Sequence, residues 1–194
     1  MKFFIIIILL PSLSFGQSKI DFGRYTKVWV LNTSDEPQNL LLSENTSIKS
    51  NNFFPNSKLN ELSLYIPGNN NLIFKNGNKY ILSYLINNSI DTISIDRCDA
   101  TIYPAETQIL VNSEWKTFQI SMGSSCGNSY FKSGLLPKSF YTLHIERPFE
   151  GDVPTKFRVK LKFGNKEYFS NVCSIKLTKE EIQKSNLPIK PLSL

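Results

Sequence analysis

One segment of the sequence, Gly123–Tyr130, contains the residue types that a thiol nucleophile would need. Cys126 lies there between small residues, and the only histidine of the chain, His144, comes 18 residues later in a segment of strand periodicity. A catalytic thiol needs a neighbouring imidazole and amide donors that stabilise an oxyanion. No helical pattern follows Cys126 to favour its thiolate, and a disulfide partner is available. We therefore predict that the protein is not an enzyme.

The chain has three cysteines, which in an exported protein predict one disulfide and one remaining thiol. Alternation places Cys173 on the inner face of a strand with Phe169 and Ile175. Cys98 ends a strand on its polar face, and Cys126 lies in a loop. We predict a Cys98–Cys126 disulfide that would close a loop of about 28 residues and stabilise by about 3 kcal/mol. A bridge between the sheets to Cys173 is the main rival.

Metal and cofactor sites are not indicated by the sequence. One histidine cannot supply a His-rich zinc site, and the cysteines lack C-x-x-C spacing. Asp91, Asp96 and Asp99 lie close together but lack the oxygen-rich repeat of a calcium loop. The sequence contains no Gly-rich phosphate-binding loop. We expect no metal and no cofactor.

The amino-terminal residues have the features of a secretory signal peptide. Met1-Lys2 is a positively charged start, residues 3–10 are an unbroken apolar run, and Gly16 supplies a small residue for cleavage. This run is too short to span a bilayer, which takes about 20 apolar residues. We predict that residues 1–16 are removed and that the mature chain is secreted or periplasmic, without a membrane span.

The net charge of the mature chain is mildly positive. The full chain carries +6, and Lys2 is the only charged residue within 1–16, so +5 remains. Lys156, Arg158, Lys160 and Lys162 alternate with Phe157, Val159, Leu161 and Phe163, so one strand has a cationic and an apolar face. The cationic face has no aromatic residues of its own on which bases could stack, and we predict no nucleic-acid partner.

Short strand patterns with turn signals every ten residues or so predict an all-β fold. A hairpin is predicted from Thr155 to Leu177 around Gly164-Asn165-Lys166, another across Asn112-Ser113-Glu114, and a central strand over residues 80–86. This pattern indicates an immunoglobulin-like antiparallel β-sandwich. Thr178 and Glu181 fit a capping box, which predicts one short carboxy-terminal helical turn.

The predicted domain organisation has four parts. Residues 1–16 are the signal peptide, and residues 17–60 hold amino-terminal strands and an Asn-rich loop that packs on or extends the sandwich. Residues 61–178 form the β-sandwich domain, and residues 179–194 are a carboxy-terminal tail. Within the first strand of the mature chain, Trp29 is expected to face the core, between Val28 and Val30.

A binding surface is predicted at the long loop and at the cationic strand. Trp115 follows a hairpin turn, and the Gly/Ser-rich loop over residues 123–136 carries three further candidates. Loops at the end of a rigid sandwich commonly carry binding residues, and aromatic side chains supply much of the affinity. The candidate residues are Trp115, Asn128, Tyr130, Phe131, Lys156, Arg158, Lys160 and Lys162.

Three stretches resemble a group of uncharacterised exported bacterial proteins with an immunoglobulin-like sandwich. They are Gln108–Asn112 with Trp115-Lys116, Ser125–Tyr130, and Thr155–Leu161. The resemblance covers roughly the second half of the chain and implies the fold and the compartment, with no activity or functional residues. We therefore expect a non-enzymatic binding module of the cell envelope whose partner is a protein or an envelope component. The alternative is an inhibitor or immunity-type protein that neutralises a toxin or protease.

Overall fold

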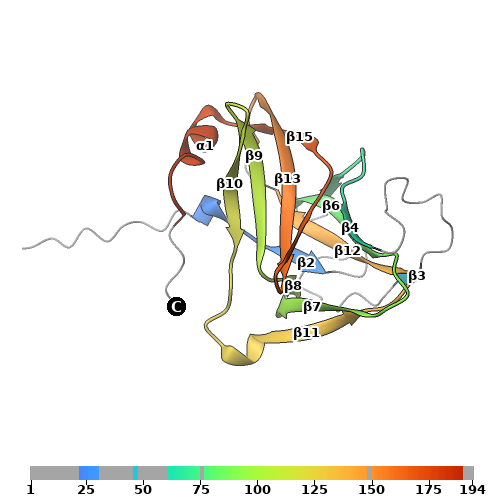
Figure 1. The fold of residues 1–194 in the computed structure, drawn as a ribbon. Coiled ribbons are helices and arrows are strands. Elements are labelled where there is room, and N and C mark those ends of the chain that lie inside the picture. The colour runs from blue at the N-terminus through green and yellow to red at the C-terminus, as the bar shows by residue number, and fades with distance from the viewer. Residues whose placement is uncertain (1–21, 31–45, 48–60, 75–76, 148–149, 190–194) are drawn as a thin grey trace, which may run out of the picture.

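The computed structural model describes residues 22–30, 46–47, 61–74, 77–147 and 150–189. The predicted signal peptide lies outside these residues, as does most of the Asn-rich loop. The described residues are mainly β-strands in two sheets with one short helix (Figure 1). The prediction of an all-β sandwich is confirmed.

The first sheet, sheet A, has five strands along its main path and a sixth beside them. The order is β1 (Tyr25–Thr26), β10 (Glu114–Ser121), β9 (Ala105–Val111), β13 (Val153–Phe163) and β14 (Lys166–Phe169), and β15 (Cys173–Leu177) also pairs with β13. The β1–β10 pair is parallel and the others are antiparallel. The strand β13 pairs with three strands, β9, β14 and β15, and the predicted hairpin turns at Gly164-Asn165 between β13 and β14.

The second sheet, sheet B, contains the remaining nine strands. Its main order is β11 (Tyr130–Leu135), β7 (Ile93–Cys98), β8 (Thr101–Ile102), β2 (Val28–Val30), β12 (Ser139–Glu146), β6 (Lys79–Asn87) and β4 (Leu62–Tyr65). The short strands β3 (Thr46–Ser47) and β5 (Asn71–Ile73) pair with β12 and β6. In Figure 1 the strands of sheet A cross those of sheet B, with the core between them.

The period-two pattern of β13 explains how this core forms. Phe157, Val159 and Leu161 are fully buried and belong to the central hydrophobic cluster, together with residues from β2, β6 and β12 of the facing sheet. The intervening cations lie on the outer face of sheet A. Burying each of these apolar side chains stabilises the fold by about 1.5–3 kcal/mol relative to exposure.

The return strand of the hairpin departs from the predicted alternation. The chain leaves the ladder at residues 170–172, so that β14 and β15 are separate strands instead of one continuous strand. As a result Tyr168 packs against the core, whereas Phe169 points outward and is 42% exposed. The prediction that Phe169 faces inward with Cys173 and Ile175 is therefore wrong for Phe169, because an interruption of the strand resets its period.

The described amino-terminal residues join both sheets. The strand β1 pairs with β10 in sheet A, and β2 pairs with β12 and β8 in sheet B. Within β2, Val28 and Val30 are fully buried, whereas Trp29 lies on the opposite face and its Nε1 donates to Glu146 Oε1 at 3.1 Å. The expectation that Trp29 faces the core is wrong, because the two smaller β-branched residues take that face.

A second link joins the amino-terminal residues to the carboxy-terminal helix α1 (Lys179–Lys184). Thr178 and Glu181 form the predicted capping box at the start of this helix. Arg24, from the 3-10 helix η1 (Phe22–Arg24), is buried and donates to the backbone oxygens of Phe118, Lys184 and Leu187. Nothing helical in the described residues is long and apolar enough to cross a membrane.

Candidate binding face

Arg158 lies between two aromatic rings on the outer face of sheet A. Its guanidinium carbon is 4.1 Å from the ring centre of Trp115 and 4.4 Å from that of Phe169. Its Nε donates to Gln108 Oε1 at 2.8 Å. Arg158 of β13 pairs with Gln108 of β9. Trp115 of β10 pairs with Leu110, which lies two residues after Gln108 on β9. The stacked guanidinium is thereby fixed in place on a rigid sheet.

Along β13 the cations differ in how they are neutralised. Lys160 Nζ lies 3.4 Å from Glu106 Oε2 and 3.1 Å from Glu167 Oε1. Burial lowers the pKa of Lys160, but the hydrogen bond to Glu167 and the charge of Glu106 raise it by a larger amount. The net shift of the pKa is therefore upward. Within the described residues Lys156, Arg158 and Lys162 have no carboxylate partner. Burial lowers the pKa of Arg158.

These side chains form one continuous surface, which we call the Arg158 face. It consists of Gln108, Trp115, Lys156, Arg158, Lys160, Lys162 and Phe169. Aromatic rings flank an arginine that retains free donors, and two exposed lysines lie beside it. Trp, Arg and Phe in such an arrangement are typical of the energetic centre of protein interfaces.

The other predicted binding residues lie elsewhere. Asn128 belongs to the 3-10 helix η2 (Gly127–Ser129), and Tyr130 and Phe131 belong to β11, the edge strand of sheet B. Trp115 is near the start of β10, about 20 Å along that strand from its end at Ser121. Figure 1 shows the β9–β10 turn at the top and β11 at the bottom. The predicted surface therefore divides into two.

The predicted loop over residues 123–136 is more ordered than the sequence indicates. Its second half is β11, which pairs with β7 over six residues. Its first half is held by the Tyr130 hydroxyl, which donates to Ser124 O and accepts from Ser124 N, both at 2.9 Å. A Cβ on Gly123 would lie 2.5 Å from this hydroxyl, so only glycine fits there without movement.

All three cysteines of the chain are free thiols in the structure, so the predicted Cys98–Cys126 disulfide is not formed there. Cys98 is 4% exposed and lies against the Tyr130 hydroxyl and the backbone of Ser124, instead of on a polar, open strand end. Burial raises its pKa, as it raises that of Cys173 to about 11. Cys126 is exposed. The Tyr130–Ser124 contacts hold the loop in place of a bridge.

His144 does not meet Cys126. It pairs with Trp29, which pairs with Thr101, which pairs with Cys98, so three inter-strand spacings, or about 14 Å, separate it from the strand end that contacts this loop. His144 is 2% exposed and packs edge-on against Phe74. Burial lowers its pKa to about 4, and its Nδ1 has no hydrogen-bond partner in the described parts of the chain. An imidazole in this environment is neutral at pH 7.

A second arginine framed by aromatic rings was not singled out by the sequence patterns. Arg97 is 3% exposed, and its guanidinium carbon lies 5.7 Å and 6.0 Å from the ring centres of Phe131 and Tyr141. Its Nε donates to Thr101 O, and its Nη2 has no hydrogen-bond partner within the residues that the structure describes. Burial lowers its pKa to about 10. Its place on the inner side of β7, after Ile93 and Ile95, is the only sequence signal of its burial.

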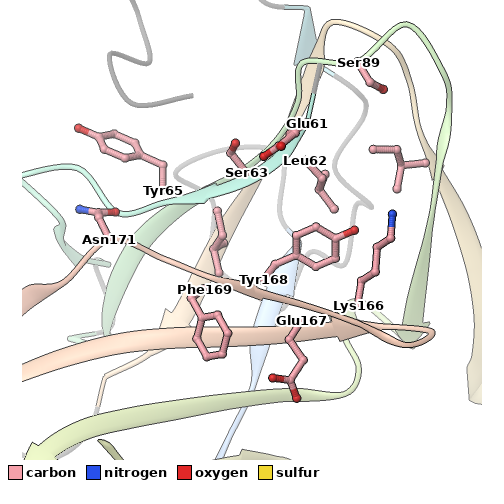
Figure 2. A pocket seen from close by; sticks show the side chains of 12 residues that line it. Glu61, Leu62, Ser63, Tyr65, Ser89, Lys166, Glu167, Tyr168, Phe169 and Asn171 are labelled. Atoms are coloured by element: carbon pink, nitrogen blue, oxygen red, sulfur yellow. The ribbon is translucent and has the colours of Figure 1, made fainter. Parts of the chain in front are cut away.

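A groove of about 660 Å³ lies between β4 of sheet B and β14 of sheet A. Figure 2 shows Lys166 and Tyr168 pointing into it and Phe169 and Glu167 pointing to the other side of β14. Leu62 lines the opposite wall. Because Phe169 also stacks on Arg158, the groove begins where the Arg158 face ends.

Metal-binding residues are not brought together in the described parts of the chain, where no group of three or more His, Cys, Asp and Glu could hold an ion. Comparison of the sequence and the structure with known proteins found no matching family, no matching curated protein and no matching solved structure. Function must therefore be inferred from the surface of this molecule.

Proposed function

We propose that the protein is an exported, non-enzymatic binding module of the cell envelope that holds an acidic partner protein on the Arg158 face. In this proposal the sandwich is immunoglobulin-like, residues 1–16 are a signal peptide, and the mature chain is secreted or periplasmic. The resemblance of the second half to exported bacterial sandwich proteins supports the compartment.

One observation supports this function most directly: Arg158 is stacked between two aromatic rings, and its charge has no carboxylate partner among the described residues. A guanidinium held between two rings loses little conformational freedom on binding, because its position is already fixed. It retains nitrogen donors that a carboxylate could accept in a bidentate manner. Lys156 and Lys162, on the same strand and face, add attraction for an acidic surface and accelerate the encounter.

The inhibitor or immunity-type alternative uses the same face in a different way. A rigid sheet surface with a fixed arginine would suit a partner enzyme whose active site is acidic. The two functions differ in one outcome, since an inhibitor abolishes the activity of the partner and a simple binding module leaves it intact.

The test measures binding of the mature protein to envelope extract of the source cell at increasing salt. Arg158→Ala should remove most of the binding, and Lys156→Glu with Lys162→Glu should abolish it. The control is Lys132→Glu with Lys138→Glu, which makes the same charge change in β11, where Lys132 pairs with Asp96, and in the turn before β12. Binding of the wild type should fall steeply between 50 and 500 mM salt, since the screening length of exposed charges shortens from roughly 14 Å to roughly 4 Å over this range.

Two results would contradict the proposal. The first is binding that is insensitive to salt and to Arg158→Ala. The second is equal loss in the sheet B control, which would indicate a general effect of net charge instead of recognition by one face.

A further inference from the structure

We propose that the groove between β4 and β14 is a second binding site, which takes an extended peptide segment of a partner protein by strand addition. The occupant would pair its backbone with the open edges of the two strands, direct an apolar side chain onto Tyr168 and Leu62, and place a carboxylate near Lys166. This site goes beyond the Arg158 face and uses different groups.

Among the described residues, no strand pairs with the edge of β4 that faces away from β6. Asn88 N donates to Glu61 O, so in this antiparallel ladder alternate residues from Glu61 onward bond to β6. Leu62, Leu64 and Ile66 therefore direct their N–H and C=O groups away from β6. Leu64 forms an isolated parallel bridge to Ser170. Among the described residues, the backbone groups of Leu62 are therefore the ones in the groove that a further strand could pair with.

The opposite wall, β14, has an open position at the same level. Ser170 N donates to Val159 O, so the alternation bonds Tyr168 and Lys166 to β13. Glu167 then directs its backbone N–H and C=O away from β13. From the Leu64–Ser170 bridge the two edges diverge, and the groove occupies the space between them (Figure 2).

The molecule already contains a small version of the proposed contact. The Asn171 side-chain amide donates to Ile66 O at 2.8 Å and its Oδ1 accepts from Ile66 N at 2.7 Å. The side-chain amide thereby makes the two hydrogen bonds that the N–H and C=O of one residue of an added antiparallel strand would make to Ile66, the residue after β4. Asn171 therefore pairs with the Ile66 end of this edge, and among the described residues the Leu62 end has no backbone partner.

The charge and the floor of the groove specify the peptide. Tyr168 packs against the core on the floor and presents its ring to the groove, which favours an apolar side chain. Lys166 points into the groove from β14, is exposed, and has no carboxylate partner among the described residues. The Glu61 carboxylate lies on the β4 side, where its charge adds to burial in raising the pKa of Tyr168, so the attraction for an acidic side chain is confined to the end of the groove at Lys166. An acidic residue in the peptide would complement Lys166. An extended segment would contact both walls and the floor, whereas a compact small molecule would leave the backbone positions of Leu62 and Glu167 unpaired.

The experiment selects binders from a displayed library of random octapeptides, with the mature protein as the target. The selected peptides should carry an apolar residue and an acidic residue, and their binding should survive Arg158→Ala. Amide hydrogen exchange at Leu62 and Glu167 should slow at least tenfold when such a peptide binds. Glu167→Pro should abolish binding, because proline removes the N–H that faces the groove while leaving the β13 ladder intact.

The matched control is Glu167→Gln, which removes the carboxylate but keeps the N–H and should retain binding. If Glu167→Pro does not fold, amide hydrogen exchange of the wild type at Leu62 and Glu167, with and without peptide, tests the proposal instead. Failure to select any peptide, protection that avoids Leu62 and Glu167, or unchanged binding by folded Glu167→Pro would each overturn the proposal. Because Arg158→Ala is expected to be silent here, failure of this site and failure of the Arg158 face are distinguishable.

Discussion

Two arginines of this protein are each framed by two aromatic rings, and they differ in depth. Arg158 lies on the outer face of sheet A, half-buried, with ring centres at 4.1 Å and 4.4 Å. Arg97 lies on the inner side of sheet B, 3% exposed, with ring centres at 5.7 Å and 6.0 Å. Neither has a carboxylate partner among the described residues.

The difference shows that the same residue types serve different purposes according to their hydration. Water and a partner can still reach Arg158, so its lack of a counter-ion makes it available for binding. Arg97 is closed off from water. Burying its charge lowers the stability of the fold, and its contacts with Thr101 and the two rings offset part of that loss. We expect substitutions at buried cationic groups to change stability and substitutions on the Arg158 face to change binding.

The largest effect on stability is expected at His144, a buried basic group that packs against the ring of Phe74. Its pKa is lowered from 6.5 to about 4, so the unfolded state binds the proton first as the pH falls. The free energy of unfolding should be at its full value above pH 6.5 and should lose about 3 kcal/mol between pH 7 and pH 4. Urea unfolding at both pH values measures this loss. In His144→Gln the loss should be smaller by that amount, and an equal loss would contradict it.

Arg97 should give the next largest effect. Arg97→Ala removes a large buried side chain and should lower the free energy of unfolding by about 2 kcal/mol, because the lost packing outweighs relief of the buried charge. Arg97→Met keeps most of the volume and should cost less than about 1 kcal/mol. Denaturant unfolding of both variants checks this. If Arg97→Met were as damaging as Arg97→Ala, the charge itself would be stabilising and the comparison of the two arginines would fail.

Arg158→Ala should have a small effect on stability. The stacking contacts of an exposed arginine contribute about 0.5–1 kcal/mol. The variant should therefore keep its fold and lose about 1 kcal/mol, while most of its binding to envelope extract disappears. Thermal unfolding and the binding assay, run on one preparation, separate the two effects. A loss of stability as large as that of Arg97→Ala would make Arg158 a structural residue.

The smallest effect is expected from modification of Cys126. Cys126 is exposed and lies just before η2, away from Trp115 at the start of β10, whereas Cys98 is buried and Cys173 is half-buried with its pKa raised by burial to about 11. Maleimide should add once within minutes and again only on unfolding, as followed by intact mass. The single label should leave both stability and binding unchanged. Two rapid additions, or none, would show that the thiols differ from this arrangement.

The sequence was sufficient for the parts of this architecture that local periodicity determines. The alternation of β13, the turn at Asn112-Ser113 and the capping box at Thr178 were all predicted correctly. Trp115 and Arg158 were each predicted as binding residues. Their contact was not, because it depends on the order β10–β9–β13, which is set by packing of the whole sheet.

Other features depend on interruptions of the period, which local patterns do not reveal. Phe169 turned outward because the chain leaves the ladder after Phe169 and β15 begins again at Cys173. The sequence pattern predicts a loop where β11 forms, because Tyr130–Leu135 contains Gly134 and shows no alternation of apolar and polar residues, as an exposed edge strand permits. The groove forms where β4 meets β14, two strands that lie about 100 residues apart in the chain. No local sequence pattern predicts that contact.

The most direct test of the central claim is site-specific photo-crosslinking in envelope extract. A photoreactive amino acid at Ser174, which pairs with Lys156 on the Arg158 face, is compared with one at Ser94, exposed on sheet B. An acidic protein should crosslink at position 174 and not at 94, and Arg158→Ala or high salt should remove the product. A product at 94 alone, or one at 174 that persists in Arg158→Ala at high salt, would contradict the assignment of binding to this face.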